Sequence, residues 1–139
     1  MKDYRKSNLA KVDLRNMDLK NVDFRRADLS NTNLSGKTII NCDFTCVNLR
    51  GANCNRSDFR GANLRGADMS GCDLGNANLK GADLSGTKLQ NAKLDGANLS
   101  KTYIRGTDIR GVDFKNVNLK DAIIKLVYDG EYKRVRSLP

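Results

Sequence analysis

Two kinds of side chain in this 139-residue sequence could do chemistry, four cysteines and sixteen acids, and no histidine is present to assist them. Ser-His-Asp catalysis, Cys-His catalysis and His-containing zinc sites are therefore excluded. The cysteines stand at positions 42, 46, 54 and 72, at spacings that do not form paired Cys-x-x-Cys ligands. We expect no metal, no cofactor and free structural thiols, with Cys46 the outermost of the four.

The acids belong to a repeat of five residues that runs through nearly the whole chain. Every fifth residue from Tyr4 to Ile124 is apolar, 25 positions in all, and the residue two places earlier is small or apolar in 23 of them. Between these two columns lies Asp or Asn in 20 of 25 units, and twelve of the sixteen acids occupy this position. A short carboxylate or amide there can accept backbone N–H groups at a bend. We interpret these acids as residues of the fold and predict no catalysis.

A period of five fits neither the 3.6 residues of an α-helix nor the alternation of a flat strand. Both apolar columns point inward only if the chain turns a corner once per repeat. Four corners close a coil of about 20 residues, and coils stack roughly 4.8 Å apart, the spacing of hydrogen-bonded strands. A disulfide between adjacent coils needs cysteines about 20 residues apart, and the sequence offers no such pair.

Units such as Ala62-Asn63-Leu64-Arg65-Gly66 and Ala82-Asp83-Leu84-Ser85-Gly86 resemble those of the pentapeptide-repeat proteins. The resemblance covers residues 2–126 and implies an all-β fold, a right-handed quadrilateral β-helix of about six coils, roughly 25 to 30 Å long. Members of this family include plain solenoids, parts of scaffolds, and fluoroquinolone-resistance proteins that bind DNA gyrase by mimicking duplex DNA. Those mimics carry a strongly acidic face, whereas this chain has a net charge of +9.

Residues 20 apart should share one side of the solenoid, so the charges can be assigned to four faces. Face 1, whose units are centred on Tyr4 and every twentieth residue after it, has eight cations and four acids. Face 4, centred on Leu19 and every twentieth residue after it, has six cations and three acids, and the other two faces are nearly neutral. The outward cations are Arg5, Arg25, Arg65, Arg105 and Lys125 on face 1, and Lys20, Arg60, Lys80 and Lys120 on face 4.

These stripes of cations suggest a binding surface for a polyanion, since rows of Arg and Lys attract such partners. The preferred hypothesis is a non-catalytic interaction scaffold that binds an acidic protein or nucleic acid. A gyrase-binding protein is the alternative, and a merely solvated surface is the third interpretation. The longest apolar run is three residues, too short to cross a bilayer, so we expect a cytoplasmic protein that does not associate with membranes.

Lys37 departs from the pattern, because it occupies a position where a small inward residue belongs. A buried, unpaired ammonium group is costly. We therefore expect Lys37 to extend to the surface or the corner around it to be distorted.

The repeat fades after Ile124, and residues 127–139 form a separate tail. Its single Asp129-Gly130 pair, flanked by β-prone residues, predicts a hairpin. An open solenoid end needs a cover, and the C-terminal element of several family members forms a homodimer. The residues expected to cap the end or form a dimer are Val127, Tyr128, Tyr132, Val135 and Leu138.

Overall fold

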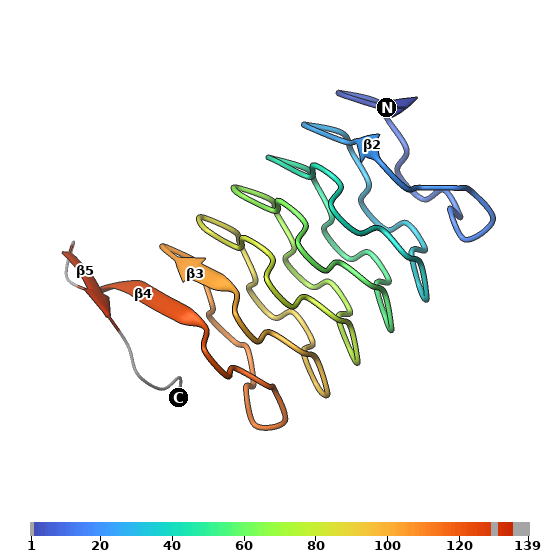
Figure 1. The fold of residues 1–139 in the computed structure, drawn as a ribbon. Helices are drawn as coiled ribbons and strands as arrows, with labels where there is room; N and C mark the ends of the chain where they lie inside the picture. The colour runs from blue at the N-terminus through green and yellow to red at the C-terminus, as the bar shows by residue number, and fades with distance from the viewer. Residues whose placement is uncertain (1, 129–130, 135–139) are drawn as a thin grey trace.

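The chain winds into a stack of coils in the computed structural model, which describes residues 2–128 and 131–134 (Figure 1). Residues of adjacent coils pair in parallel at an offset of 20, as in Asn8 with Asp28 and Asp83 with Tyr103. Turns recur every five residues, which gives four per coil. The predicted β-helix is confirmed.

Regular strands are short, because each side of a coil is only a few residues long. Strand β1 (Lys2–Asp3) pairs in parallel with β2 (Val22–Asp23), and β3 (Tyr103–Arg105) pairs in parallel with β4 (Ile123–Tyr128). Most other pairings are isolated bridges. The part of the chain that the structure describes contains no helix that is long and apolar enough to cross a membrane.

The Asp and Asn residues before the inward column form the bends, as the sequence indicates. The backbone N–H of Thr45 donates to Asp43 Oδ1 at 3.0 Å, and that of Lys80 donates to Asn78 Oδ1 at 3.2 Å. The same contact, two residues apart, recurs along the stack from Asp3 to Asn118. These side chains therefore satisfy backbone donors that the corners would otherwise leave unpaired.

The two inward columns fill the tube and are buried through most of its length. Beneath face 1, Tyr4, Phe24 and Phe44 stack with ring centroids 5.8 and 5.1 Å apart. Leu64 and Leu84 continue this column toward the C-terminus. The core under face 1 is thus aromatic at one end and aliphatic toward the other.

All four cysteines are free, and Cys46 alone among them is exposed, as predicted. Cys54 and Cys72 are both buried in the core. The neighbouring Cys54 thiol, together with burial, raises the pKa of Cys72 well above its ordinary value. A rule that considers only residues 20 apart does not predict this proximity, because Cys54 and Cys72 belong to different inward columns.

The turn that contains Lys37 is regular, with the Lys37 N–H donating to Leu34 O at 3.1 Å, and the irregularity that the sequence suggests lies between this unit and the preceding coil. The Lys37 ammonium group turns back to the preceding coil and donates to the carbonyl oxygens of Met17 and, at 3.0 Å, Arg15. Within the described residues, the parallel ladder has no bridge between Asp18 and Thr38 at this point. The side chain thus satisfies the Met17 carbonyl, which the interrupted ladder leaves open, and makes a second bond to the Arg15 carbonyl.

The C-terminal hairpin is present as predicted. Strand β4 pairs antiparallel with β5 (Glu131–Arg134), with Val127 opposite Tyr132, so that β5 lies at the edge of the sheet formed with β3 and β4 (Figure 1). Strand β4 runs through the expected boundary between the solenoid and its tail. Of the proposed cap residues, Val127, Tyr128 and Tyr132 lie on these strands, whereas Val135 and Leu138 lie outside the described residues.

Candidate functional site

Face 1 has two outward columns that determine its charge. One follows the inward residue of each unit and contains Arg5, Arg25, Thr45, Arg65, Ser85, Arg105 and Lys125. The other precedes the inward residue and contains Asp3, Asp23, Asp43, Asn63, Asp83, Tyr103 and Ile123. Side chains two residues apart on an extended segment point the same way. The two outward residues of each unit can therefore interact with each other.

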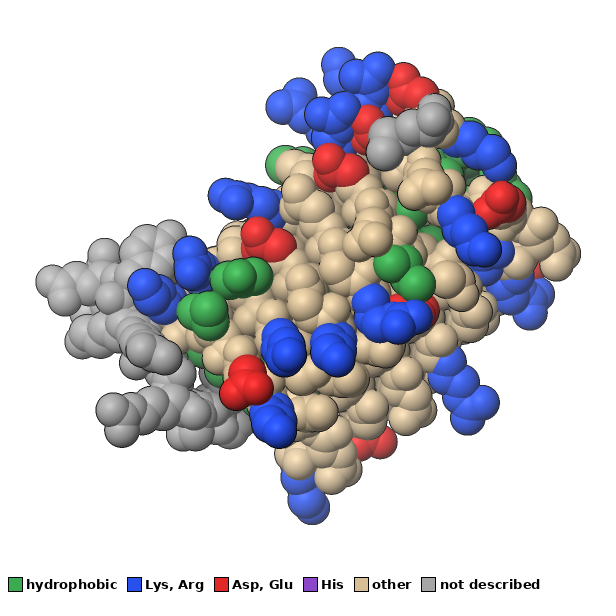
Figure 2. Space-filling model, in the orientation of Figure 1, with side chains coloured by type: hydrophobic (Ala, Val, Ile, Leu, Met, Phe, Trp, Pro, Cys, Tyr) green, Lys and Arg blue, Asp and Glu red, His purple; other side chains and the backbone are tan. Residues whose placement is uncertain are grey.

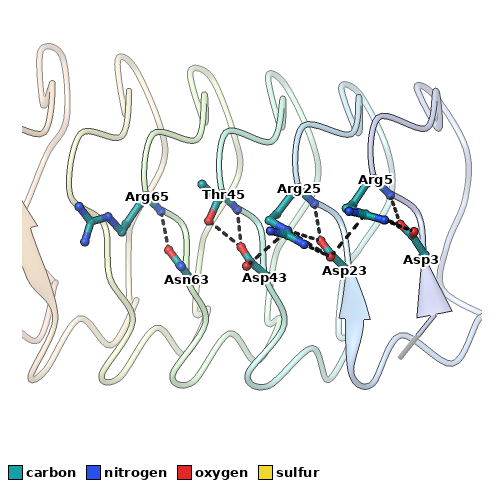
Figure 3. Close-up of polar contacts among 8 residues, drawn as sticks. All are labelled: Asp3, Arg5, Asp23, Arg25, Asp43, Thr45, Asn63 and Arg65. Carbon is teal, nitrogen blue, oxygen red and sulfur yellow. Dashed lines mark hydrogen bonds and ion pairs between the residues drawn. The ribbon is translucent and has the colours of Figure 1, made fainter.

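At the N-terminal end of face 1, these columns form a continuous ladder of ion pairs (Figure 3). Arg5 Nη2 donates to Asp3 Oδ2 at 2.7 Å, and Arg25 Nη2 donates to Asp23 Oδ2 at 2.7 Å, each with a second bond from Nε. Between coils, the Nε atoms of Arg5 and Arg25 lie 3.8 Å from Oδ2 of Asp23 and Asp43. The guanidinium charges here are neutralised by the protein itself.

The carboxylates respond to this pairing as electrostatics requires. Hydrogen bonding to the Arg25 side chain lowers the pKa of Asp23, and Arg5 does the same for the pKa of Asp3. In the same way, Arg15 lowers the pKa of Asp13 to about 2. Asp-x-Arg is thus a recurrent pairing motif, which is also present at Asp58 with Arg60 and at Asp108 with Arg110.

Toward the C-terminus of face 1 the pairing motif is interrupted. Arg65 follows Asn63, which accepts only its backbone N–H, and the guanidinium extends away from that amide (Figure 3). Its nearest carboxylate is Asp83, at 3.7 Å. Arg105 follows Tyr103 and lies over its ring, with the guanidinium carbon 5.3 Å from the centroid. Among the side chains that the structure describes, no acid forms an ion pair with Arg105.

These cations surround a cavity of about 760 Å³, which we call the basic hollow. Its size falls within the range of ligand pockets. The last residue of each unit on face 1, which lies at the corner, explains the space. At this position the first three coils have Lys6, Arg26 and Cys46, whereas the next coils have glycines with positive φ angles. The hollow is lined by Thr45, Cys46, Arg65, Gly66, Asp83, Ser85, Gly86, Tyr103, Arg105 and Lys125.

The structure divides the nine cations that the sequence suggested as binding residues. It brings Arg65, Arg105 and Lys125 together at the hollow. Arg5, Arg25 and Arg60 are held by acids of their own units. Figure 2 shows cations and acids side by side at the N-terminal end of the molecule. The remaining three, Lys20, Lys80 and Lys120, are exposed on face 4 and do not line the hollow.

Sequence reasoning missed Tyr103 and Ser85 as residues of this site. The signal was nevertheless present in the column before the inward residue: Asn63 and Tyr103 stand where an acid would capture the arginine two places on. A count of cations on a face does not show which of them has a carboxylate two residues earlier.

The arrangement is suited to binding an anion. Among the described residues that line the hollow are two guanidinium groups, one ammonium group and the hydroxyls of Thr45, Ser85 and Tyr103, against one carboxylate, that of Asp83. The part of the chain that the structure describes holds no group of three Cys, Asp or Glu side chains that could bind a metal ion.

Comparison with known families gives one match, a model described as pentapeptide repeats, in eight copies over residues 5–36, 42–81 and 82–121. No curated protein matches significantly.

Several solved structures are similar. A pentapeptide repeat protein from the thylakoid lumen of Arabidopsis thaliana is 34% identical over 68% of this chain and 66% of its own, with a TM-score of 0.65. HetL, involved in heterocyst differentiation regulation in the cyanobacterium Nostoc sp. strain PCC 7120, is 29% identical over 94% of this chain and 68% of its own, with a TM-score of 0.55.

QnrB1, a plasmid-mediated fluoroquinolone resistance protein, is 16% identical over 84% of this chain and 64% of its own, with a TM-score of 0.34. That similarity is too low to support a shared function. The chain spans about two thirds of the length of each of these three proteins.

Proposed function

The chain belongs to the pentapeptide-repeat family, and on this premise we propose that it is a non-catalytic binding scaffold whose basic hollow receives an acidic partner. Proteins of this family are generally structural or interaction proteins. A rigid stack that buries its inward columns leaves only the outward columns free to vary. Partner choice should therefore depend on the outward residues of face 1.

One observation carries the proposal: on the same face, some arginines have an acid in their own unit and others do not. Arg5 and Arg25 each donate from Nε and Nη2 to the carboxylate of their own unit, with the Nη2 bond at 2.7 Å. Arg105 has a tyrosine ring in place of that carboxylate, and Arg65 has an amide. Cations without a close internal acid attract an external one more strongly, because no existing ion pair must be broken.

The test compares two matched double variants of the full chain. R65Q/R105Q removes two of the three positive charges at the hollow, and R5Q/R25Q removes two charges of the same column at the other end. Binding to an immobilised Glu-rich peptide should fall strongly in the first variant and little in the second. Equal losses in both variants would mean that net charge alone attracts the peptide, which would contradict the proposal.

The gyrase-binding alternative calls for a separate measurement, a supercoiling assay with and without a fluoroquinolone. Because a basic particle attracts DNA where a DNA mimic must repel it, we expect no protection of gyrase. Protection would instead favour the alternative. The assay also reveals nonspecific DNA binding, which would point to nucleic acid as the partner.

A homodimer through the C-terminal end stays a prediction. It is supported by the position of β5 at the edge of its sheet, since edge strands can pair with a second chain. Sedimentation of the full chain and of a chain lacking residues 127–139 tests it, because a dimer should be present in the first and lost in the second.

The cytoplasmic location also stays a prediction, because one similar protein comes from the thylakoid lumen.

A further inference from the structure

The basic hollow has the features of a site for one particular anion. We propose, building on the proposed function, that it binds a phosphomonoester, with the phosphate held between Arg65 and Arg105 above Ser85. The phosphate can belong to a phosphorylated side chain or to a free nucleotide, since both present the same dianionic group.

The stacking of the coils sets the separation of the two arginines. Arg65 and Arg105 are two coils apart in one column, roughly 9.6 Å along the axis from the interstrand spacing. The residue between them is Ser85, whose side chain is small and leaves space for a group that both guanidinium forks can reach. Lys125, one coil beyond Arg105, adds a third positive charge.

Phosphate suits this site better than a carboxylate because it has more acceptor oxygens and more charge. A carboxylate satisfies one fork with its two oxygens, as Asp23 does for Arg25 at 2.7 Å. A phosphomonoester offers three terminal oxygens and nearly two negative charges. It can therefore accept bonds from two forks and from the Ser85 hydroxyl at once.

Among the described residues that line the hollow, one is an acid, and it is poorly placed to block the site. Asp83 Oδ1 accepts the backbone N–H of Ser85 at 2.9 Å, while Oδ2 lies 3.7 Å from Arg65 Nη1. This contact between coils resembles those of Arg5 and Arg25 with the next coil, at 3.8 Å. Arg65 differs from them because it lacks the 2.7 Å pair within its own unit, so its guanidinium group keeps donors available. The lining side chains carry three positive charges against one negative charge.

Tyr103 acts as a positioning residue for this site. It occupies the column in which Asp23 captures Arg25, and its half-exposed ring carries the Arg105 guanidinium on its face. The cation–π contact holds the guanidinium without using its N–H donors. An aspartate at this position would form the Asp-x-Arg ion pair with Arg105.

This substitution provides a test that leaves every cation in place. Y103D should create an Asp-x-Arg ion pair with Arg105. Y103F should retain the ring and serves as the matched control. The full chain, labelled with ¹⁵N, is titrated in separate experiments with O-phosphoserine, adenosine 5′-monophosphate and a Glu-containing peptide. The amide signals of Ser85, Gly86 and Arg105 report on the site.

We expect both phosphate compounds to shift these signals in the wild type and in Y103F. Affinity should fall about tenfold or more in Y103D, because a charge-assisted hydrogen bond is lost. The tighter of the two compounds identifies the source of the phosphate. A role for Tyr103 in folding alone predicts unchanged phosphate affinity in a folded Y103D protein, and that result would overturn its role here.

Two further results would overturn the inference. One is equal binding of the Glu-containing peptide and the phosphate compounds, and the other is no phosphate binding by the wild type. Neither affects the proposed function, which stands if R65Q/R105Q still loses the acidic partner. Loss of phosphate binding in R65Q/R105Q, with retention in R5Q/R25Q, would support both proposals.

Discussion

The two ends of face 1 use the same columns of the same repeat and yet present opposite surfaces. From Asp3 to Asp43, alternating acids and arginines form ion pairs with one another, and the corner residues carry long side chains. From Arg65 to Lys125, the acids are mostly replaced and two of the corners are glycines that line a hollow. A few substitutions at outward positions therefore convert a self-neutralised surface into a candidate binding site, while the buried columns hardly change.

The largest effect should come from the aromatic stack under the N-terminal end. F24A removes a fully buried ring that stacks on Tyr4 and Phe44. We expect the free energy of unfolding to fall by about 3 to 5 kcal/mol, because the neighbouring coils are fixed and the cavity cannot collapse. Urea unfolding followed by circular dichroism measures this. A loss below about 1 kcal/mol would show that the stack is not essential.

The next effect compares two acids of one column, Asp23 and Asp83. Asp23 is nearly buried and bonds to the backbone and side chain of Arg25, whereas Asp83 is more exposed and makes one short bond, to the Ser85 backbone. D23A should lower the free energy of unfolding by about 1 to 2 kcal/mol, and D83A by about 1 kcal/mol or less. Equal losses would remove the energetic distinction between the two ends.

Acidification should loosen the N-terminal end of face 1 first. Since the pKa of Asp3 and of Asp23 is lowered on folding by hydrogen bonds to Arg5 and Arg25, these groups bind fewer protons in the folded state. Their stabilisation is present above the unfolded pKa of about 3.9 and is lost as pH falls below it through the folded pKa. Amide protection factors, corrected for the intrinsic exchange rate at each pH, should therefore fall between pH 4 and pH 2 near Tyr4 and Phe24 more than near Leu84. A uniform loss of protection would contradict this.

Much of this architecture could be predicted from the sequence, because a repeat of five with two inward columns permits few structures. The parallel register, the bends made by Asp and Asn, the exposed Cys46 and the C-terminal hairpin all follow from residue type and spacing. Which cations remain unpaired could not be predicted from charge counts. It depends on the contact between positions two residues apart, and on whether the first of them is an acid, an amide or a ring.

The smallest effect concerns the floor of the hollow, which glycine keeps open. Gly86 has a φ of +67°, and a Cβ atom there would make only ordinary contacts, with Gly66 N at 3.9 Å. Asn adopts this conformation at several corners, including Asn41. G86N should therefore change the free energy of unfolding by less than about 1 kcal/mol.

The added side chain in G86N would extend from the floor of the hollow, so anion affinity should fall even though every charge remains. G81N is the matched control, because Gly81 has a similar φ of +71° and does not line the hollow. Titration with O-phosphoserine compares the two variants. If both bind as the wild type does, the space above Gly86 plays no part in recognition, and the two ends of face 1 differ only in whether each arginine has an acid in its own unit.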